Sequence, residues 1–112
     1  MIKITTKELK RVDVVKVTGR VDSNTAPQLE NALNRIINAG RFRIVVDLNE
    51  TEYMSSAALR TLLSALKQVH RWNRGDLRLT NMPEKIKKAF DLAGFLELFQ
   101  VFDDEVEAVG SF

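Results

Sequence analysis

The apolar run of residues 43–48, with Ile44, Val45 and Val46 at its centre, is the feature that most constrains the fold of this chain. The run is short and rich in β-branched residues, which favours a strand over a helix. Successive side chains of a strand point to opposite faces, so an uninterrupted apolar run needs cover on both sides. Such cover is typical of parallel strands joined by helical crossovers. The run therefore predicts a central strand of an α/β domain.

Helical patterns lie on both sides of this predicted strand. Before it, apolar residues recur at helical spacing over residues 29–37, and we expect Asn24 or Thr25 to cap this helix. After it, residues 59–69 repeat apolar side chains at the same spacing and predict a second helix. Residues 73–75 are expected to break that helix.

The remaining elements complete an alternating order of strands and helices. We expect a hairpin of residues 2–7 and 12–18 that ends at Gly19, a strand at 76–80, a helix that starts within 81–84 and ends at Gly94, a strand at 99–102 and a helix at 103–109. A strand–helix–strand rhythm gives parallel pairing with right-handed crossovers. The sequence thus predicts a single α/β domain over residues 1–112, with a mixed, mainly parallel β-sheet, an N-terminal hairpin and about four helices packed on it.

Composition argues against several classes of function. With 45% hydrophobic and 29% charged residues, the chain is typical of a folded domain. Its basic residues are scattered and its net charge is only +2, so we expect no direct contact with nucleic acid. There is no cysteine, and the lone histidine, His70, is expected on the surface. No apolar run approaches the roughly 20 residues that span a bilayer, and no signal peptide is recognised. We expect a cytoplasmic protein without membrane insertion.

The stretch of residues 52–60 joins the predicted central strand to the second helix. Ser55 and Ser56 meet the first turn of that helix, where a serine hydroxyl accepts a hydrogen bond from an otherwise unpaired N–H. Such strand-to-helix corners lie at the rim of a sheet, where α/β domains tend to carry function. From the local residues alone, a helix cap is the commoner role for these serines and a regulatory site is the rarer one.

Residue chemistry gives little support for catalysis, a cofactor or a metal. No glycine-rich phosphate loop is present. His70 is the only suggested base for Ser56, but it lies about four turns further along the predicted helix, roughly 20 Å away. Carboxylates near the predicted strand ends either hold Mg²⁺ or are solvated loop charges, and the second role is commoner. These carboxylates are Asp22, Asp47, Glu50 and Glu52.

Three stretches, in the right order, carry a resemblance that covers nearly the whole chain. Residues 19–29, GRVDSNTAPQL, resemble the pattern G-x-L-D-x-x-T-A-x-x-L of STAS domains of the anti-sigma factor antagonist family. Residues 44–48, IVVDL, followed by residues 53–59, YMSSAAL, resemble that family's strand and its D-S-x-G-L corner. Residues 90–102, FDLAGFLELFQVF, are similar to the family's ending.

The resemblance implies a function and partners. Members of the family bind an anti-sigma factor or a related switch kinase, which phosphorylates the serine after the motif's aspartate. Phosphorylation ends the binding, and a cognate phosphatase restores it. In this sequence the modified serine is Ser56, with Ser55 as the alternative. The implied partner-binding residues are Asp22, Ser23, Asn24, Thr25, Ser55, Ser56, Ala57 and Arg60.

The chain departs from the family pattern at two corner positions. Ser55 stands where the motif has aspartate, and Ala58 stands where it has glycine. Alanine suits position 58 if that residue is already helical, whereas a positive φ there would need glycine.

Two other functions stay open. One is a scaffold or accessory subunit of a transport or stress-signalling complex, without a phosphate cycle. The other is an enzyme or nucleotide binder, which titration with ATP and GTP would reveal.

Overall fold

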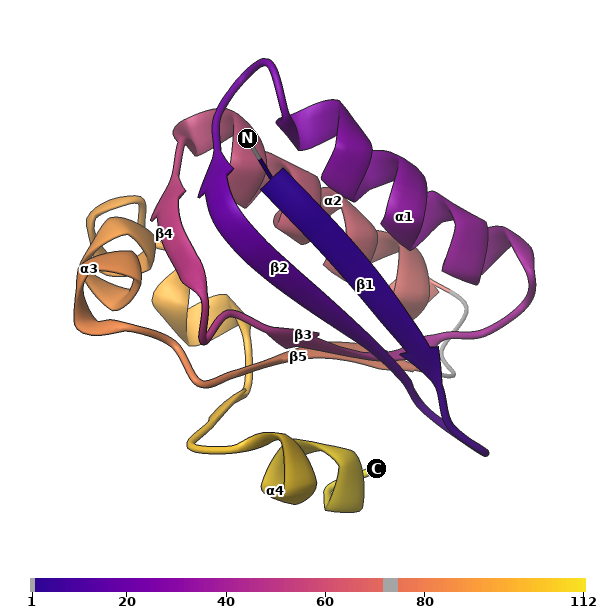
Figure 1. Cartoon of the computed structure of the whole chain (residues 1–112). Coiled ribbons are helices and arrows are strands. Elements are labelled where there is room, and N and C mark those ends of the chain that lie inside the picture. Colours follow the sequence, from indigo (N-terminus) through magenta and orange to yellow (C-terminus); the bar gives the residue numbers. More distant parts are fainter. Residues whose placement is uncertain (1, 72–74) are drawn as a thin grey trace.

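The computed structural model describes residues 2–71 and 75–112 as a mixed sheet covered by helices (Figure 1). Its strands are β1 (Ile2–Glu8), β2 (Asp13–Val21), β3 (Arg43–Asp47), β4 (Thr51–Met54), β5 (Asp76–Thr80) and β6 (Val101–Phe102). Its helices are α1 (Ala26–Asn38), α2 (Ser56–Arg71), α3 (Glu84–Leu92), α4 (Glu105–Gly110) and the short 3-10 helix η1 (Leu96–Leu98). The break expected at residues 73–75 falls largely outside the described residues.

Pairing within the sheet follows the predicted arrangement. Strands β1 and β2 form the antiparallel N-terminal hairpin, and the order across the sheet is β1-β2-β3-β5-β6. The pairs β2–β3, β3–β5 and β5–β6 are parallel, as is the additional pair β2–β4. The prediction of a mixed, mainly parallel sheet with an N-terminal hairpin is therefore confirmed.

Both faces of the central strand β3 are covered, as its apolar run predicts. Ile44 and Val46 pack into the large core under α1 and α2, which lie side by side on one face of the sheet (Figure 1). Val45 points to the opposite face and joins a smaller cluster with Val14 and with Ala108 of α4. All three β3 side chains are fully buried. The strand is held between two layers of helix.

The helices present the apolar faces that their spacing predicts. In α1 the side chains of Leu29 and Leu33 are buried, and in α2 those of Leu62 and Val69 are buried. These buried side chains pack α1 and α2 against the sheet. Their first turns lie at the same end of the sheet (Figure 1). That end carries the predicted site residues.

Two expectations about strands are wrong. Residues 51–54 form the strand β4 rather than a loop, and β4 pairs with the last part of β2. Strand β2 does not end at Gly19 but continues to Val21 through an irregularity at Gly19 and Arg20. Gly19 has a φ of 101°, which glycine adopts without steric cost. Its N–H donates to the carbonyl of Glu50 over 3.0 Å, so the irregularity helps to align β4 with β2.

Candidate functional site

Strand β4 sets the position of the serine corner, by which we mean Ser55, Ser56 and the first turn of α2. Met54, the last residue of β4, is 3% exposed and is paired with Val21 of β2. The N–H of Ser55 continues this pairing by donating to the carbonyl of Val21 over 2.8 Å. Asp22 follows Val21 directly. The structure therefore brings the serine corner beside the turn of residues 22–25, as expected for stretches that follow neighbouring parallel strands.

Asp22 and Thr25 cap the turn before α1 reciprocally. The carboxylate oxygen Oδ1 of Asp22 accepts the N–H groups of Asn24 and Thr25 at 2.9 and 3.0 Å. In return, the hydroxyl of Thr25 accepts the N–H of Asp22 at 2.9 Å. This is the geometry of a capping box, with threonine in the place of the usual glutamate. Thr25 is the N-cap residue of α1, as expected, but its side chain accepts no helix N–H. The side-chain hydrogen bonds to the N–H groups of this turn come from Asp22 instead.

The capping geometry also sets the charge of this turn. The hydrogen bond from the Thr25 N–H, supported by the one from Asn24, lowers the pKa of the Asp22 carboxyl below its ordinary value. Asp22 is therefore a fixed negative charge at neutral pH. Ser23 and Asn24 lie at the tip of the turn with exposed side chains. These two are available to a partner, whereas Asp22 and Thr25 hold the turn in shape.

The two serines of the corner have different surroundings. Ser55 is half-buried, and its hydroxyl accepts the N–H of Ala58 at 3.3 Å, which makes it the cap of α2. Ser56 is the first residue of α2 and is exposed, and its hydroxyl has no hydrogen-bond partner among the described residues. The geometry thus separates a structural serine from an accessible one.

This separation accounts for both departures from the motif. Serine and aspartate are about equally good helix caps, so Ser55 caps α2 as an aspartate at this position could. Ala58 lies within α2 and is fully buried, so its backbone does not need the positive φ that would require glycine. Position 58 is already helical, where alanine is favoured over glycine.

The remaining residues predicted for the partner surface lie on the first turns of α2. Ala57 is half-buried and packs against the main core, whereas Arg60 is exposed. Arg60 follows Ser56 by four positions, so both side chains project from the same face of the helix. No acidic residue lies in the first turn of α2. The positive end of its dipole therefore carries no neutralising side chain of its own.

Sequence reasoning missed one pair beside the corner. The guanidinium carbon of Arg20 lies 4.5 Å from the ring centre of Tyr53, a cation–π contact between paired residues of β2 and β4. Tyr53 is 40% exposed, so the pair forms a flat, partly apolar surface next to the Asp22 turn. The sequence did not predict this contact because it depends on the pairing of β2 with β4, and β4 itself was not predicted.

Of the four carboxylates considered for Mg²⁺, Asp22, Asp47 and Glu50 have separate partners, and Glu52 is exposed on β4. Asp22 caps the turn, and buried Asp47 accepts the N–H of Asn49 at 2.9 Å and the amide of Asn81 at 3.2 Å. Glu50 pairs with Lys16 at 3.1 Å. Within residues 2–71 and 75–112, no three His, Asp or Glu side chains gather closely enough to hold a metal ion.

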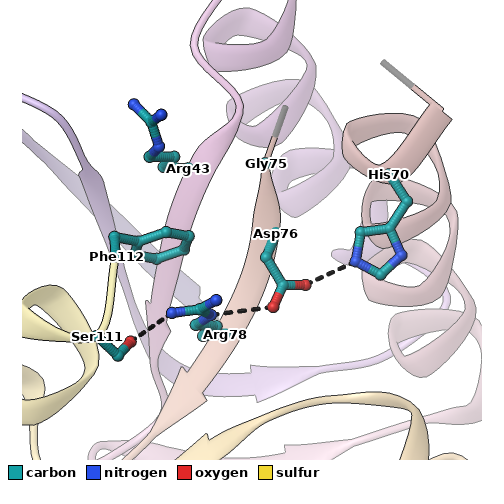
Figure 2. Close-up of a pocket in the computed structure, with 7 residues that line it drawn as sticks. All are labelled: Arg43, His70, Gly75, Asp76, Arg78, Ser111 and Phe112. Carbon is teal, nitrogen blue, oxygen red and sulfur yellow. Dashed lines mark hydrogen bonds and ion pairs between the residues drawn. The ribbon is translucent and has the colours of Figure 1, made fainter. Parts of the chain in front are cut away.

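His70 lies at the far end of α2 from the serines. It is exposed, as expected, and its Nε2 is 2.8 Å from a carboxylate oxygen of Asp76 (Figure 2). The four helical turns between Ser56 and His70 leave this imidazole out of reach of the serine.

In the described part of the chain, no helix is both long enough and apolar enough to cross a membrane.

Comparison with known proteins agrees with the resemblance seen in the motifs. Residues 3–108 match the family model of the STAS domain. BtrV of Bordetella bronchiseptica, named as an anti-sigma factor antagonist, is 32% identical over 111 residues, which is 99% of this chain and 95% of that one.

Solved structures share the fold. An anti-sigma factor antagonist from Mycobacterium paratuberculosis superposes with a TM-score of 0.84 at 22% identity, covering 99% of this chain and 93% of that one. The unphosphorylated and phosphorylated forms of SpoIIAA, a Bacillus cell fate determinant, each give a TM-score of 0.76 at 16% and 17% identity. Both alignments cover 97% of this chain, and 96% and 98% of those chains.

Proposed function

Because the chain belongs to the STAS domain family of anti-sigma factor antagonists, we propose that it binds an anti-sigma factor or switch kinase and is released when Ser56 is phosphorylated. The observation that carries this proposal is the different surroundings of the two corner serines. Ser56 is exposed at the first position of α2, whereas the hydroxyl of Ser55 is occupied as a helix cap. A kinase can reach the Ser56 hydroxyl without dismantling the cap.

The fold itself should tolerate a phosphate on Ser56. The modification adds about −1.5 to −2 charges at pH 7. At a helix N-terminus an anion is favourable by about 0.3–1 kcal/mol, and α2 has no acidic side chain there to oppose it. Arg60, on the same helical face, offers a second favourable contact. Support comes from SpoIIAA, whose phosphorylated and unphosphorylated forms resemble this fold equally well.

Binding of the partner should be far more sensitive than folding. A partner that covers Ser56 also covers the turn of residues 22–25, because the two stretches are joined through Val21 and Ser55. The phosphate would then be desolvated close to the fixed negative charge of Asp22. Like charges at an interface cost several kcal/mol, and about 1.4 kcal/mol already weakens affinity tenfold. A single phosphate is thus sufficient to end binding without a change of shape, and a cognate phosphatase would restore it.

Affinity capture from extracts of the source organism tests this proposal. Wild type and Ser56→Asp are used side by side, with Ser64→Asp as the matched control because Ser64 is an exposed serine further along α2. We expect wild type and the Ser64 variant to retrieve an ATP-binding serine kinase that the Ser56 variant does not. Mass spectrometry identifies the captured protein, and circular dichroism checks that all three chains are folded.

The same experiment distinguishes the second candidate, a scaffold or accessory subunit that docks through the corner without a phosphate cycle. That candidate is favoured by the absence of the motif's aspartate, since the charge beside the modified serine is lost at Ser55. If all three chains retrieve the same transport or stress-signalling complex and no kinase, Ser56 is not a switch. The accessory role then replaces the regulatory one.

A further inference from the structure

Cationic side chains gather at the end of the molecule opposite the serine corner. They come from the hairpin turn, the start of β3, the end of α2 and β5, and they line three adjoining hollows. Their volumes are about 750, 410 and 280 Å³, and Arg43 lines both the largest and the smallest. We call this surface the basic groove. Its cations are Lys10, Arg11, Arg41, Arg43, Arg71 and Arg78.

Two of these cations, Arg41 and Arg78, form ion pairs with aspartates and lie on the floor of the groove. Arg41 pairs with buried Asp13 and also donates to the carbonyl of Leu9 at 2.6 Å. Arg78 pairs with Asp76 at 2.9 Å, and its guanidinium carbon lies 4.0 Å from the ring centre of Phe112 (Figure 2). The first set of contacts holds Arg41 against the hairpin, and the second joins β5 to the C-terminal residue Phe112.

The other cations of the groove have no such partner. Among the described residues, Lys10, Arg11, Arg43 and Arg71 form no ion pair. All four side chains are exposed, and Figure 2 shows Arg43 standing apart from the Asp76–Arg78 pair. Unpaired cations held around a hollow attract an anionic ligand, and guanidinium groups form bidentate hydrogen bonds with carboxylates and phosphates.

We propose that the basic groove docks an acidic peptide segment of a protein partner. Half-buried aromatic rings, Phe42 and Phe112, line the groove between the cations and suit a peptide that carries apolar as well as acidic side chains. The floor also carries Asp13 and Asp76. Because these carboxylates are paired with Arg41 and Arg78, the floor adds no net charge and four exposed cations are left for a ligand. Four cations match a peptide with a few spaced carboxylates better than a phosphate polymer, in which every unit is charged.

The groove is a surface separate from the serine corner. Helix α2 runs from Ser56 at the corner to Arg71 at the groove, and its 16 residues span roughly 24 Å at 1.5 Å per residue. One partner can therefore occupy the corner while an acidic segment occupies the groove. Phosphorylation of Ser56 should leave groove binding almost unchanged, because charges separated by more than about 10 Å are largely screened at moderate salt.

An NMR titration with a synthetic oligoglutamate peptide tests the groove, using the full chain labelled with ¹⁵N at low ionic strength. The groove variant carries Lys10→Gln, Arg11→Gln and Arg43→Gln. The matched control carries Lys85→Gln, Lys87→Gln and Lys88→Gln, which remove the same charge from exposed positions of α3. Each set of changes removes only exposed side chains without an ion pair in the described residues, so both variants should fold as the wild type does.

We expect oligoglutamate to shift the amide signals that line the groove and to bind the groove variant about tenfold more weakly, as the loss of three surface charge contacts implies. The α3 variant and Ser56→Asp should bind as the wild type does. Equal weakening in the groove and α3 variants would overturn the proposal, because overall charge would then explain the binding. It is equally overturned if oligoglutamate does not bind, or if tripolyphosphate or single-stranded DNA binds the groove more tightly.

Discussion

Replacing each corner serine by alanine separates the capping residue from the accessible one. Ser55→Ala removes the hydroxyl that accepts the Ala58 N–H, and loss of such a cap typically costs 0.5–2 kcal/mol or about that. The 3.3 Å distance is at the long end for a hydrogen bond, so we expect the lower part of this range, about 0.5–1 kcal/mol. Ser56→Ala removes an exposed hydroxyl without a partner, and its effect should stay within about 0.5 kcal/mol.

Thermal unfolding followed by circular dichroism measures this difference. A chain of 112 residues unfolds with an entropy of about 2.1 cal/mol/K per residue, so 1 kcal/mol corresponds to roughly 4 °C in Tm. We expect Ser55→Ala to lower Tm by about 2–4 °C, whereas Ser56→Ala changes it by less than about 2 °C. Ser55→Asp, which restores the motif's residue, should unfold close to the wild-type temperature. If Ser56→Ala is the more destabilising alanine change, the capping assignment and the reasoning about the accessible serine both fail.

Three further predictions concern the frame of the site. Thr51→Val removes a buried hydroxyl whose 2.8 Å hydrogen bond to the carbonyl of Val17 joins β4 to β2. Urea unfolding should show that the free energy of unfolding falls by about 1 kcal/mol. An unchanged urea midpoint would contradict the placement of β4. Gly75→Ala would place a Cβ 1.8 Å from the carbonyl oxygen of Phe42. We therefore expect the free energy of unfolding in urea to fall by about 2 kcal/mol or more. An unchanged free energy of unfolding would refute this close approach. The Thr25 N–H lowers the pKa of Asp22 below 3.8, so the ionised carboxylate stabilises the fold above that pH and its contribution is lost as pH falls through the lowered value. The stability gap between wild type and Asp22→Asn should therefore narrow on acidification below about pH 4 in urea unfolding, and a constant gap would count against this role.

Much of the fold could be predicted because the central strand and the two main helices carry strong periodic signals. Ile44, Val45 and Val46 required cover on both faces, and α1, α2 and α4 provide it. Strand β4 was not predicted because it has only four residues, of which only the first and last, Thr51 and Met54, are buried. Its exposed middle residues break the alternation that identifies a strand.

The site was predictable to the extent that it depends on local sequence. The motif resemblance singled out Ser56, and the cap preference of serine indicated that one of the two neighbours closes the helix. Which serine does so depends on where α2 begins, and β4 fixes that point through the hydrogen bond from Ser55 to Val21. The usual capping-box signature has glutamate or glutamine at its last position, so the pattern of Asp22 followed by Thr25 did not reveal their reciprocal hydrogen bonds. The Arg20–Tyr53 contact arises from pairing between strands and has no local signal.

The central claim is that Ser56 is the residue through which a kinase controls this protein. The most direct test is to incubate the wild-type chain with the captured kinase and ATP, and to locate the phosphate by tandem mass spectrometry. We predict phosphate on Ser56 alone and none on the Ser56→Ala chain. Phosphate on Ser55, or continued modification of Ser56→Ala, would contradict the assignment.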